Sequence, residues 1–107
     1  MARPLQHQII ARALELICDE ARWTSLVIAR TVDNKPCGCL EPAATRFCAL
    51  GALYRAASDL LRDVEPALEV VKFVLAANNR PTDSLPRIND QEGDAVIVAM
   101  FKRALAS

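Results

Sequence analysis

The chain has 107 residues and a mass of 11.7 kDa, which predicts a single domain over residues 1–107. Its 13 basic and 13 acidic residues leave no net charge. This balance argues against nucleic-acid binding, because neutralising phosphates requires a surplus of Lys and Arg. Apolar residues make up 52%, but no run approaches the roughly 20 residues that span a bilayer, so we expect a globular protein that does not cross a membrane.

The first residues run into the polar stretch Gln6-His7-Gln8 rather than into the apolar core of a signal peptide. We therefore expect a cytoplasmic protein. In that compartment the four cysteines are expected to be reduced thiols. Two of them, Cys18 and Cys48, fall on predicted apolar helical faces, where a free cysteine packs as a small hydrophobe.

Helical spacing of apolar residues predicts a first helix over residues 4–20, with Pro4 in its first turn. Arg12 and Glu15 fall on the opposite side, at the spacing of an i,i+3 ion pair. The residues expected to face the core are Leu5, Ile9, Ala13, Leu14, Ile17 and Cys18.

Residues 25–32 are rich in β-branched side chains and predict a strand, which Asp33-Asn34 turns back. Residues 35–39 could return as a second strand, confined to an edge by Pro36. We expect a small β-hairpin or an extended arm between the first two helices. Two strands alone are marginal in water, so this ribbon must pack on the helices or on another chain.

A second helix is predicted over residues 41–62, opened by Glu41-Pro42. Gly51 lies inside it, where glycine costs about 1 kcal/mol relative to alanine. We expect the close approach of another backbone to explain this glycine. The predicted apolar face consists of Phe47, Cys48, Leu50, Leu53, Tyr54, Ala57, Leu60 and Leu61.

A third helix, over residues 64–78, is apolar around most of its circumference and has only a narrow polar strip at Glu65, Glu69 and Lys72. Such a helix is either central or partly covered by a partner chain, and we favour a subunit interface.

Residues 79–86 read as a loop, and a last helix follows, capped by Asp94 after Gly93. Lys102 and Arg103 in its final turns complement the helix dipole. The predicted fold is mostly α, with about four helices around one core and the small ribbon between helices one and two.

Two short motifs resemble those of a family of small bacterial proteins of unknown function, some of them carried on prophages. The first is Arg-Phe-Cys-Ala-Leu-Gly-Ala-Leu at residues 46–53, and the second is Asn89-Asp90-x-x-Gly93. The chain departs from the second motif, because Ile88 stands where an aromatic residue is usual and Asp94 where an arginine is expected. The resemblance implies no activity.

The most promising polar group combines Arg46 with Asn89 and Asp90. Arg46 precedes a buried apolar segment, and Asp90 could hold it in a bidentate pair. This arrangement would pin a loop to the second helix. The alternative is that the same residues, with Trp23 and Tyr54, line a small ligand pocket. Trp23 itself is expected to fill the core or, if exposed, to serve at an interface.

A zinc site is the alternative use of the thiols and would draw on Cys37, Cys39 and Cys48, completed by Cys18 or His7. The single close pair, Cys37 and Cys39, lacks the two spaced pairs of structural zinc sites, so we expect no metal. A cysteine nucleophile would need His7, the one histidine, as its base. We expect His7 to be a surface residue.

We therefore predict a protein without a cofactor that acts by association, as a homodimer or with another protein partner. No glycine-rich phosphate loop, paired histidines or Ser-His-Asp arrangement occurs in the sequence. An enzyme is accordingly not expected. The alternative is a small-molecule-binding protein or minor enzyme with a pocket near Arg46 and Asp90.

Overall fold

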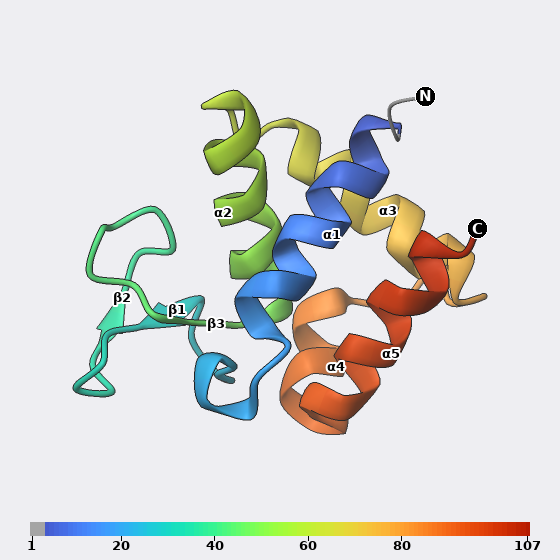
Figure 1. Cartoon of the computed structure of the whole chain (residues 1–107). Helices are drawn as coiled ribbons and strands as arrows, with labels where there is room; N and C mark the ends of the chain where they lie inside the picture. The colour runs from blue at the N-terminus through green and yellow to red at the C-terminus, as the bar shows by residue number, and fades with distance from the viewer. Residues whose placement is uncertain (1–3) are drawn as a thin grey trace.

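In the part of the chain that the structure describes, five α-helices surround one core, and a small three-stranded sheet is attached to them (Figure 1). The computed structural model describes residues 4–107, apart from the side chain of Glu20. No helix in this part of the chain is long and apolar enough to cross a membrane. In chain order, the elements are α1 (Leu5–Ile17), the 3-10 helix η1 (Glu20–Arg22), β1 (Ala29–Arg30), β2 (Pro36–Cys37), β3 (Arg46–Phe47), α2 (Ala49–Leu61), α3 (Pro66–Ala77), α4 (Leu85–Glu92) and α5 (Asp94–Leu105).

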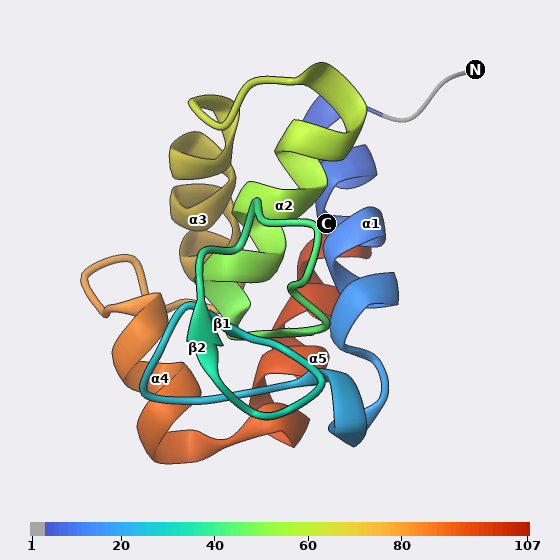
Figure 2. The ribbon, with the colours of Figure 1, turned by 90° about the vertical axis from the view of Figure 1, so that its left-hand side faces the viewer.

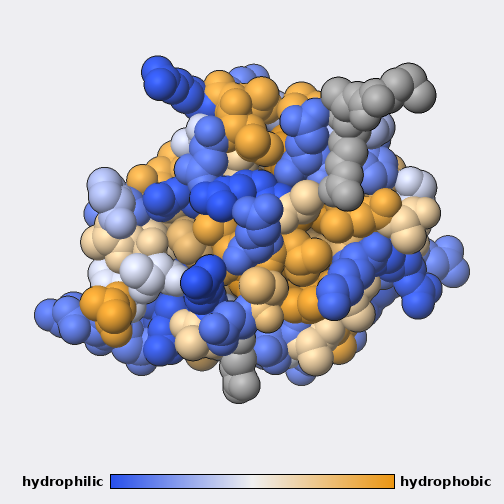
Figure 3. All heavy atoms as spheres, in the orientation of Figure 1, coloured by the Kyte–Doolittle hydropathy of each residue, from blue (hydrophilic) through white to orange (hydrophobic). Residues whose placement is uncertain are grey.

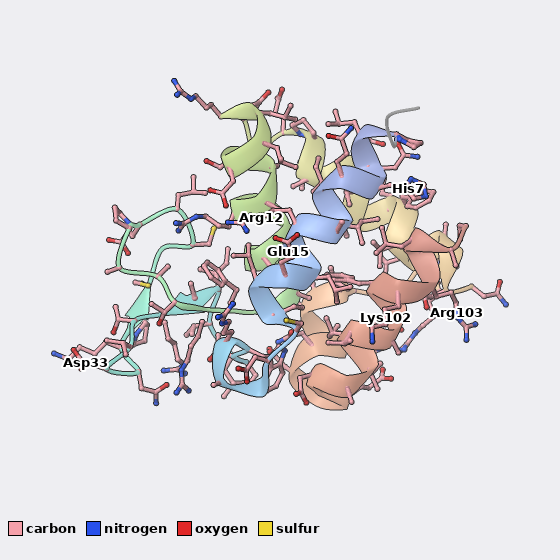
Figure 4. All side chains as sticks on the ribbon, viewed as in Figure 1. His7, Arg12, Glu15, Asp33, Lys102 and Arg103 are labelled. Atoms are coloured by element: carbon pink, nitrogen blue, oxygen red, sulfur yellow. The ribbon has the colours of Figure 1, made fainter. Side chains whose placement is uncertain are left out.

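Helix α1 packs against α2, α3 and α5 and buries Ile9, Ile10, Ala13 and Ile17. It is shorter than predicted at both ends, because Pro4 stands outside as the N-cap and the chain leaves the helix after Ile17. The predicted burial of Leu5 and Cys18 was wrong, since both are exposed. The predicted pair is confirmed, with Arg12 Nη1 3.1 Å from Glu15 Oε2 (Figure 4).

Helix α2 begins eight residues later than predicted, at Ala49 rather than at Glu41. Residues 46–47 form strand β3 instead, and Cys48 caps the helix by accepting a hydrogen bond at Sγ from the Gly51 N–H, at 3.3 Å. Leu60 and Leu61 are exposed rather than inward, and Figure 3 shows that apolar patches lie between hydrophilic ones on one face of the molecule.

The close approach of another backbone, expected at Gly51 inside α2, is present in the structure. A Cβ placed on Gly51 would lie 2.2 Å from the backbone oxygen of Ile28. No side chain is tolerated at that distance, so the glycine allows the segment before β1 to lie directly on the helix.

The ribbon between α1 and α2, residues 23–48, is called the arm below, and it lies across one side of α2 (Figure 2). The predicted hairpin is confirmed, because β1 pairs antiparallel with β2 and Ala29 stands opposite Cys37. The regular strand β1 is much shorter than residues 25–32. A third strand, β3, adds to the other side of β1 and gives the order β2-β1-β3, with Pro36 on an edge.

Helix α3 packs against α1, α2 and α5, so its nearly all-round apolar sequence is covered on three sides by the chain itself. The exposed strip contains Leu68, Glu69, Lys72 and Ala76. Helix α3 is therefore a central helix, which is one of the two alternatives that the sequence left open. No partner chain is needed to explain its apolar composition.

Helix α4 was missed by the sequence prediction, which treated residues 79–86 as a loop and the segment up to Gly93 as a turn. Ser84 caps α4 by accepting from the Arg87 N–H, and Pro86 fits its first turn. Only Leu85, Ile88 and Asn89 are buried, so the apolar signal is weak. Gly93, with φ at 93°, separates α4 from α5 and takes the N-cap position predicted for Asp94.

Candidate functional site

The structure brings three of the five predicted site residues together. Trp23, Asn89 and Asp90 meet where the start of the arm lies against α4. Arg46 lies in β3 and Tyr54 in α2, half-buried against the core. The predicted group is thus divided between different parts of the molecule.

Asn89 is a fully buried polar side chain whose four hydrogen-bonding positions are all used. Its Oδ1 accepts from Trp23 Nε1 at 2.8 Å and from the Ala49 N–H at 2.9 Å. Its Nδ2 donates to the Thr24 carbonyl at 3.1 Å and to Asp90 Oδ1 at 3.2 Å. Because an amide side chain accepts two and donates two hydrogen bonds, nothing remains for a ligand. Asn89 joins α4 to α2 and to the arm.

Asp90 is exposed and continues this connection. Its Oδ1 also accepts from the Leu26 N–H at 2.8 Å. Leu26 has a positive φ of 71°, a conformation that a leucine adopts only at a cost. Its side chain is 78% exposed. The hydrogen bond that Asp90 accepts from the Leu26 N–H therefore fixes the backbone at a position where a large apolar side chain projects into solvent.

A hollow of about 180 Å³ adjoins Leu26 and Asp90. It is lined by Leu26, Val27, Ile28, Cys48, Leu50, Pro86 and Asp90. Burial raises the pKa of the Cys48 thiol, so this sulfur is protonated at neutral pH and is a poor nucleophile. The hollow is mainly apolar with one carboxylate at its edge. It suits an aliphatic side chain rather than chemistry.

A second hollow, of about 540 Å³, shares Ile28 with the first. Its lining is formed by Ile28, Gly38, Cys39, Leu40, Glu41 and Pro42. We call the apolar residues of the two hollows the arm surface: Leu26, Val27, Ile28, Leu40, Pro42, Leu50 and Pro86.

Arg55 of α2 holds the outer part of the arm in place. Its Nη1 donates to the carbonyls of Cys39, at 3.1 Å, and Glu41, at 3.0 Å. The guanidinium also lies 5.8 Å from the centre of the Phe47 ring, within cation–π range. Residues 39–42 are thereby held on the helix.

Arg46 is not paired with Asp90, contrary to the sequence prediction. It stands opposite Arg30 across the β1–β3 pair. Strand β3 replaces the helical turn on which the predicted pairing depended. Arg46 is also not among the residues that line the hollow beside Asp90.

The four cysteines are free thiols in the structure. Cys39 and Cys48 are buried, Cys37 is half-buried and Cys18 is exposed. Within residues 4–107, no group of three or more His, Cys, Asp or Glu side chains is placed to hold a metal ion, so Cys37, Cys39 and Cys48 do not form a ligand set. His7 is half-buried, with Nε2 3.1 Å from the Ser107 oxygen and its ring against Phe73.

The sequence did not predict the roles of two residues in this region, Leu26 and Arg55. Leu26 was read as an ordinary strand residue, and nothing in its neighbours signals a positive φ. Arg55 lies outside the predicted apolar face of its helix. Its i,i+4 spacing to Asp59 fits the observed 3.2 Å pair, but this spacing does not indicate the contacts of Arg55 with the arm.

The comparison with protein families gives a match to one described as "Family of unknown function (DUF6197)", over residues 1–107. The chain belongs to this family. The DUF6197 match spans the whole chain and confirms the predicted membership of a family of unknown function. No curated protein and no solved structure matches the chain.

Proposed function

We propose that this DUF6197 protein acts by association with a second copy of itself through the arm surface. The observation that carries the proposal is Leu26. A leucine held in a costly backbone conformation, 78% exposed and beside an apolar hollow, is a feature that folding alone does not require.

The shape of the arm surface favours a second copy as the partner. A protruding leucine and a hollow able to take an aliphatic side chain lie next to each other. In a two-fold contact the same patch meets itself, so Leu26 of each copy can enter the hollow of the other. The absence of net charge means that two copies do not repel each other at long range.

The contact is expected to form through side chains rather than by strand pairing. In the alternating pattern of an antiparallel pair, Cys37 directs its backbone groups toward β1 and Pro36 occupies the outward position. Proline has no N–H to donate, so the outer edge of β2 lacks the donor that another strand would need.

The contact is also expected to join two folded monomers. The accessible surface of the chain is 6001 Å², close to the value of about 5900 Å² that the size scaling gives for a monomer of this mass. Neither copy therefore needs the other to complete its core. This differs from the interface on α3 that the sequence favoured.

Light scattering across the micromolar range tests the proposal, with twice the 11.7 kDa monomer mass expected for the wild type. Leu40 and Leu68 offer matched variants, because they are 50% and 53% exposed but lie on the arm and on α3. Leu40→Ser should shift the protein toward the monomer, and Leu68→Ser should not. A monomer at all concentrations, or dissociation by Leu68→Ser alone, would contradict the proposal.

A further inference from the structure

Two arginines share the face of the small sheet that is turned away from the core. Arg30 and Arg46 stand directly opposite each other in the β1–β3 pair, and directly opposite residues project from the same face. Their neighbours Ala29 and Phe47 form the next pair and are buried. Side chains alternate along a strand, so Arg30 and Arg46 project from the outer face.

A third arginine, Arg22, is the last residue of the 3-10 helix η1 and lies near this sheet. Trp23 forms a parallel bridge with Phe47, and the Thr24 N–H donates to the Phe47 carbonyl at 3.0 Å. Arg22 comes directly before Trp23, as Arg46 comes directly before Phe47. Arg22 is exposed and lies on the segment next to β3. Strand alternation does not apply to a 3-10 helix, so only Arg30 and Arg46 are assigned to the outer face, and we call these two the arginine face.

No carboxylate of the described residues neutralises the arginine face. The ion pairs in this part of the chain involve Arg12, Arg55, Lys72, Arg80 and Arg87. Figure 4 places Asp33 at the outer end of the hairpin, and it forms no ion pair with these arginines. Like charges directly opposite each other destabilise a sheet, so the pair of Arg30 and Arg46 is a cost that the described residues do not offset.

Arg30 is held in a fixed orientation by neutral acceptors. Its Nε donates to Thr24 Oγ1 at 2.9 Å and its Nη1 to the Asn34 carbonyl at 3.1 Å. Because both acceptors are neutral, these bonds do not neutralise the positive charge of Arg30. The Nη2 atom forms no hydrogen bond with the described residues. An arginine oriented in this way is prepared to bind an anion, because little side-chain entropy remains to be lost.

We propose that the arginine face binds the phosphate group of a small phosphorylated molecule. A phosphate monoester carries close to two negative charges and three acceptor oxygens at neutral pH. It can therefore receive hydrogen bonds from both guanidinium groups at once and remove the repulsion between Arg30 and Arg46. The site is independent of the arm surface and of the association proposed above.

Thermal unfolding with increasing inorganic phosphate, or with glycerol 3-phosphate as a simple monoester, tests the site against sodium chloride at matched ionic strength. The melting temperature should rise with phosphate and saturate, as binding to the folded state requires. Arg46→Gln is the informative variant, because the Arg46 side chain forms no hydrogen bond or ion pair with the described residues and its replacement should leave the fold intact. It should weaken phosphate binding about tenfold or more.

Arg46→Gln has a second expected effect, which distinguishes a binding site from a structural role. Without phosphate the variant should melt no lower than the wild type, because removing one of two opposing charges relieves repulsion. Arg103→Gln is the matched control, since Arg103 is an exposed arginine on α5, away from the sheet (Figure 4). A shift that follows ionic strength alone, or one of equal size in Arg46→Gln, would overturn the proposal.

Discussion

Asn89 connects three segments of the chain that are far apart in sequence. Its amide receives the Trp23 indole N–H and the Ala49 N–H, which is one of the orphan donors at the start of α2. The sequence predicted that Asn89 belongs to a polar group pinning this region, but it placed a pair of Arg46 and Asp90 at the centre of that group. Two of the four partners of Asn89, the Ala49 N–H and the Thr24 carbonyl, are backbone groups, which sequence patterns do not identify.

Replacing Asn89 by leucine should destabilise the fold strongly. The change leaves the Ala49 and Trp23 donors without an acceptor in the interior, at about 1–3 kcal/mol each. We expect a loss of about 3 kcal/mol in urea unfolding. Trp23→Phe removes one donor and keeps most of the ring, so it should cost about 1 kcal/mol. Equal losses in the two variants would contradict the role assigned to Asn89.

The cysteines should differ sharply in reactivity. Burial raises the pKa of Cys39 and of Cys48, which keeps both as protonated thiols, whereas Cys18 is exposed. A thiol reagent added to the native protein at neutral pH should modify Cys18 first and Cys39 and Cys48 slowly. Four thiols should be counted after denaturation. Rapid native modification of Cys48, measured by peptide mass spectrometry, would show that the hollow beside it is open to reagents.

Among the secondary-structure elements, the sequence predicted those that depend on the helical spacing of apolar residues or on turn-forming residues. The helical stripes of α1, α3 and α5 and the turn at Asp33-Asn34 were found in this way. Helix α4 was missed because its eight residues bury only Leu85, Ile88 and Asn89. The start of α2 was misplaced because Phe47 fits a helical stripe and a buried strand equally well, and only the pairing with β1 decides between them.

Gly51→Ala provides a test of how the arm lies on α2. Alanine gains about 1 kcal/mol of helix propensity over glycine, yet its Cβ would lie 2.2 Å from the Ile28 oxygen. We expect a net loss of about 1–3 kcal/mol, because a backbone oxygen cannot move aside as a flexible side chain can. In the control Gly38→Ala, the nearest atom is 3.5 Å away. That variant should be nearly neutral, and a stabilising Gly51→Ala would contradict the contact.

A network of ion pairs fixes the turn between α3 and α4 and so determines how α4 is placed in the whole molecule. Arg80 lies between Asp83 and Glu92, with Nη2 2.7 Å from Asp83 Oδ2 and 2.5 Å from Glu92 Oε2. Arg87 pairs with Asp83 on its other side. The bond from Arg87 is the main cause that lowers the pKa of Asp83, and the bond from Arg80 lowers the pKa of Glu92.

Acid should therefore weaken the fold through these two carboxylates. Their pKa values are lower in the folded than in the unfolded chain, where they lie near 4. The stabilisation is complete above about pH 4 and is lost as pH falls through the lower folded values. In urea unfolding at a series of pH values, Asp83→Asn with Glu92→Gln should flatten this decline, and the two curves should converge in strong acid.

The exposed pair of Glu69 and Lys72 is the control for this measurement. Their side chains are 78% and 75% exposed and 3.4 Å apart, and such pairs contribute little. Glu69→Gln should leave the pH dependence of the unfolding free energy unchanged. A decline that is as steep in the double variant as in the wild type would place the acid sensitivity elsewhere.

The most direct test of the association through the arm surface is Leu26→Asn, followed by both thermal unfolding and sedimentation equilibrium. Asparagine tolerates a positive φ better than leucine, so the folded monomer should gain about 1 kcal/mol. The dimer should weaken roughly a hundredfold, because each copy loses a buried leucine. Stability and association should therefore change in opposite directions. Association through the arm surface would be contradicted by a variant that is more stable but dimerises as the wild type does. It would also be contradicted by a variant that loses both stability and dimerisation.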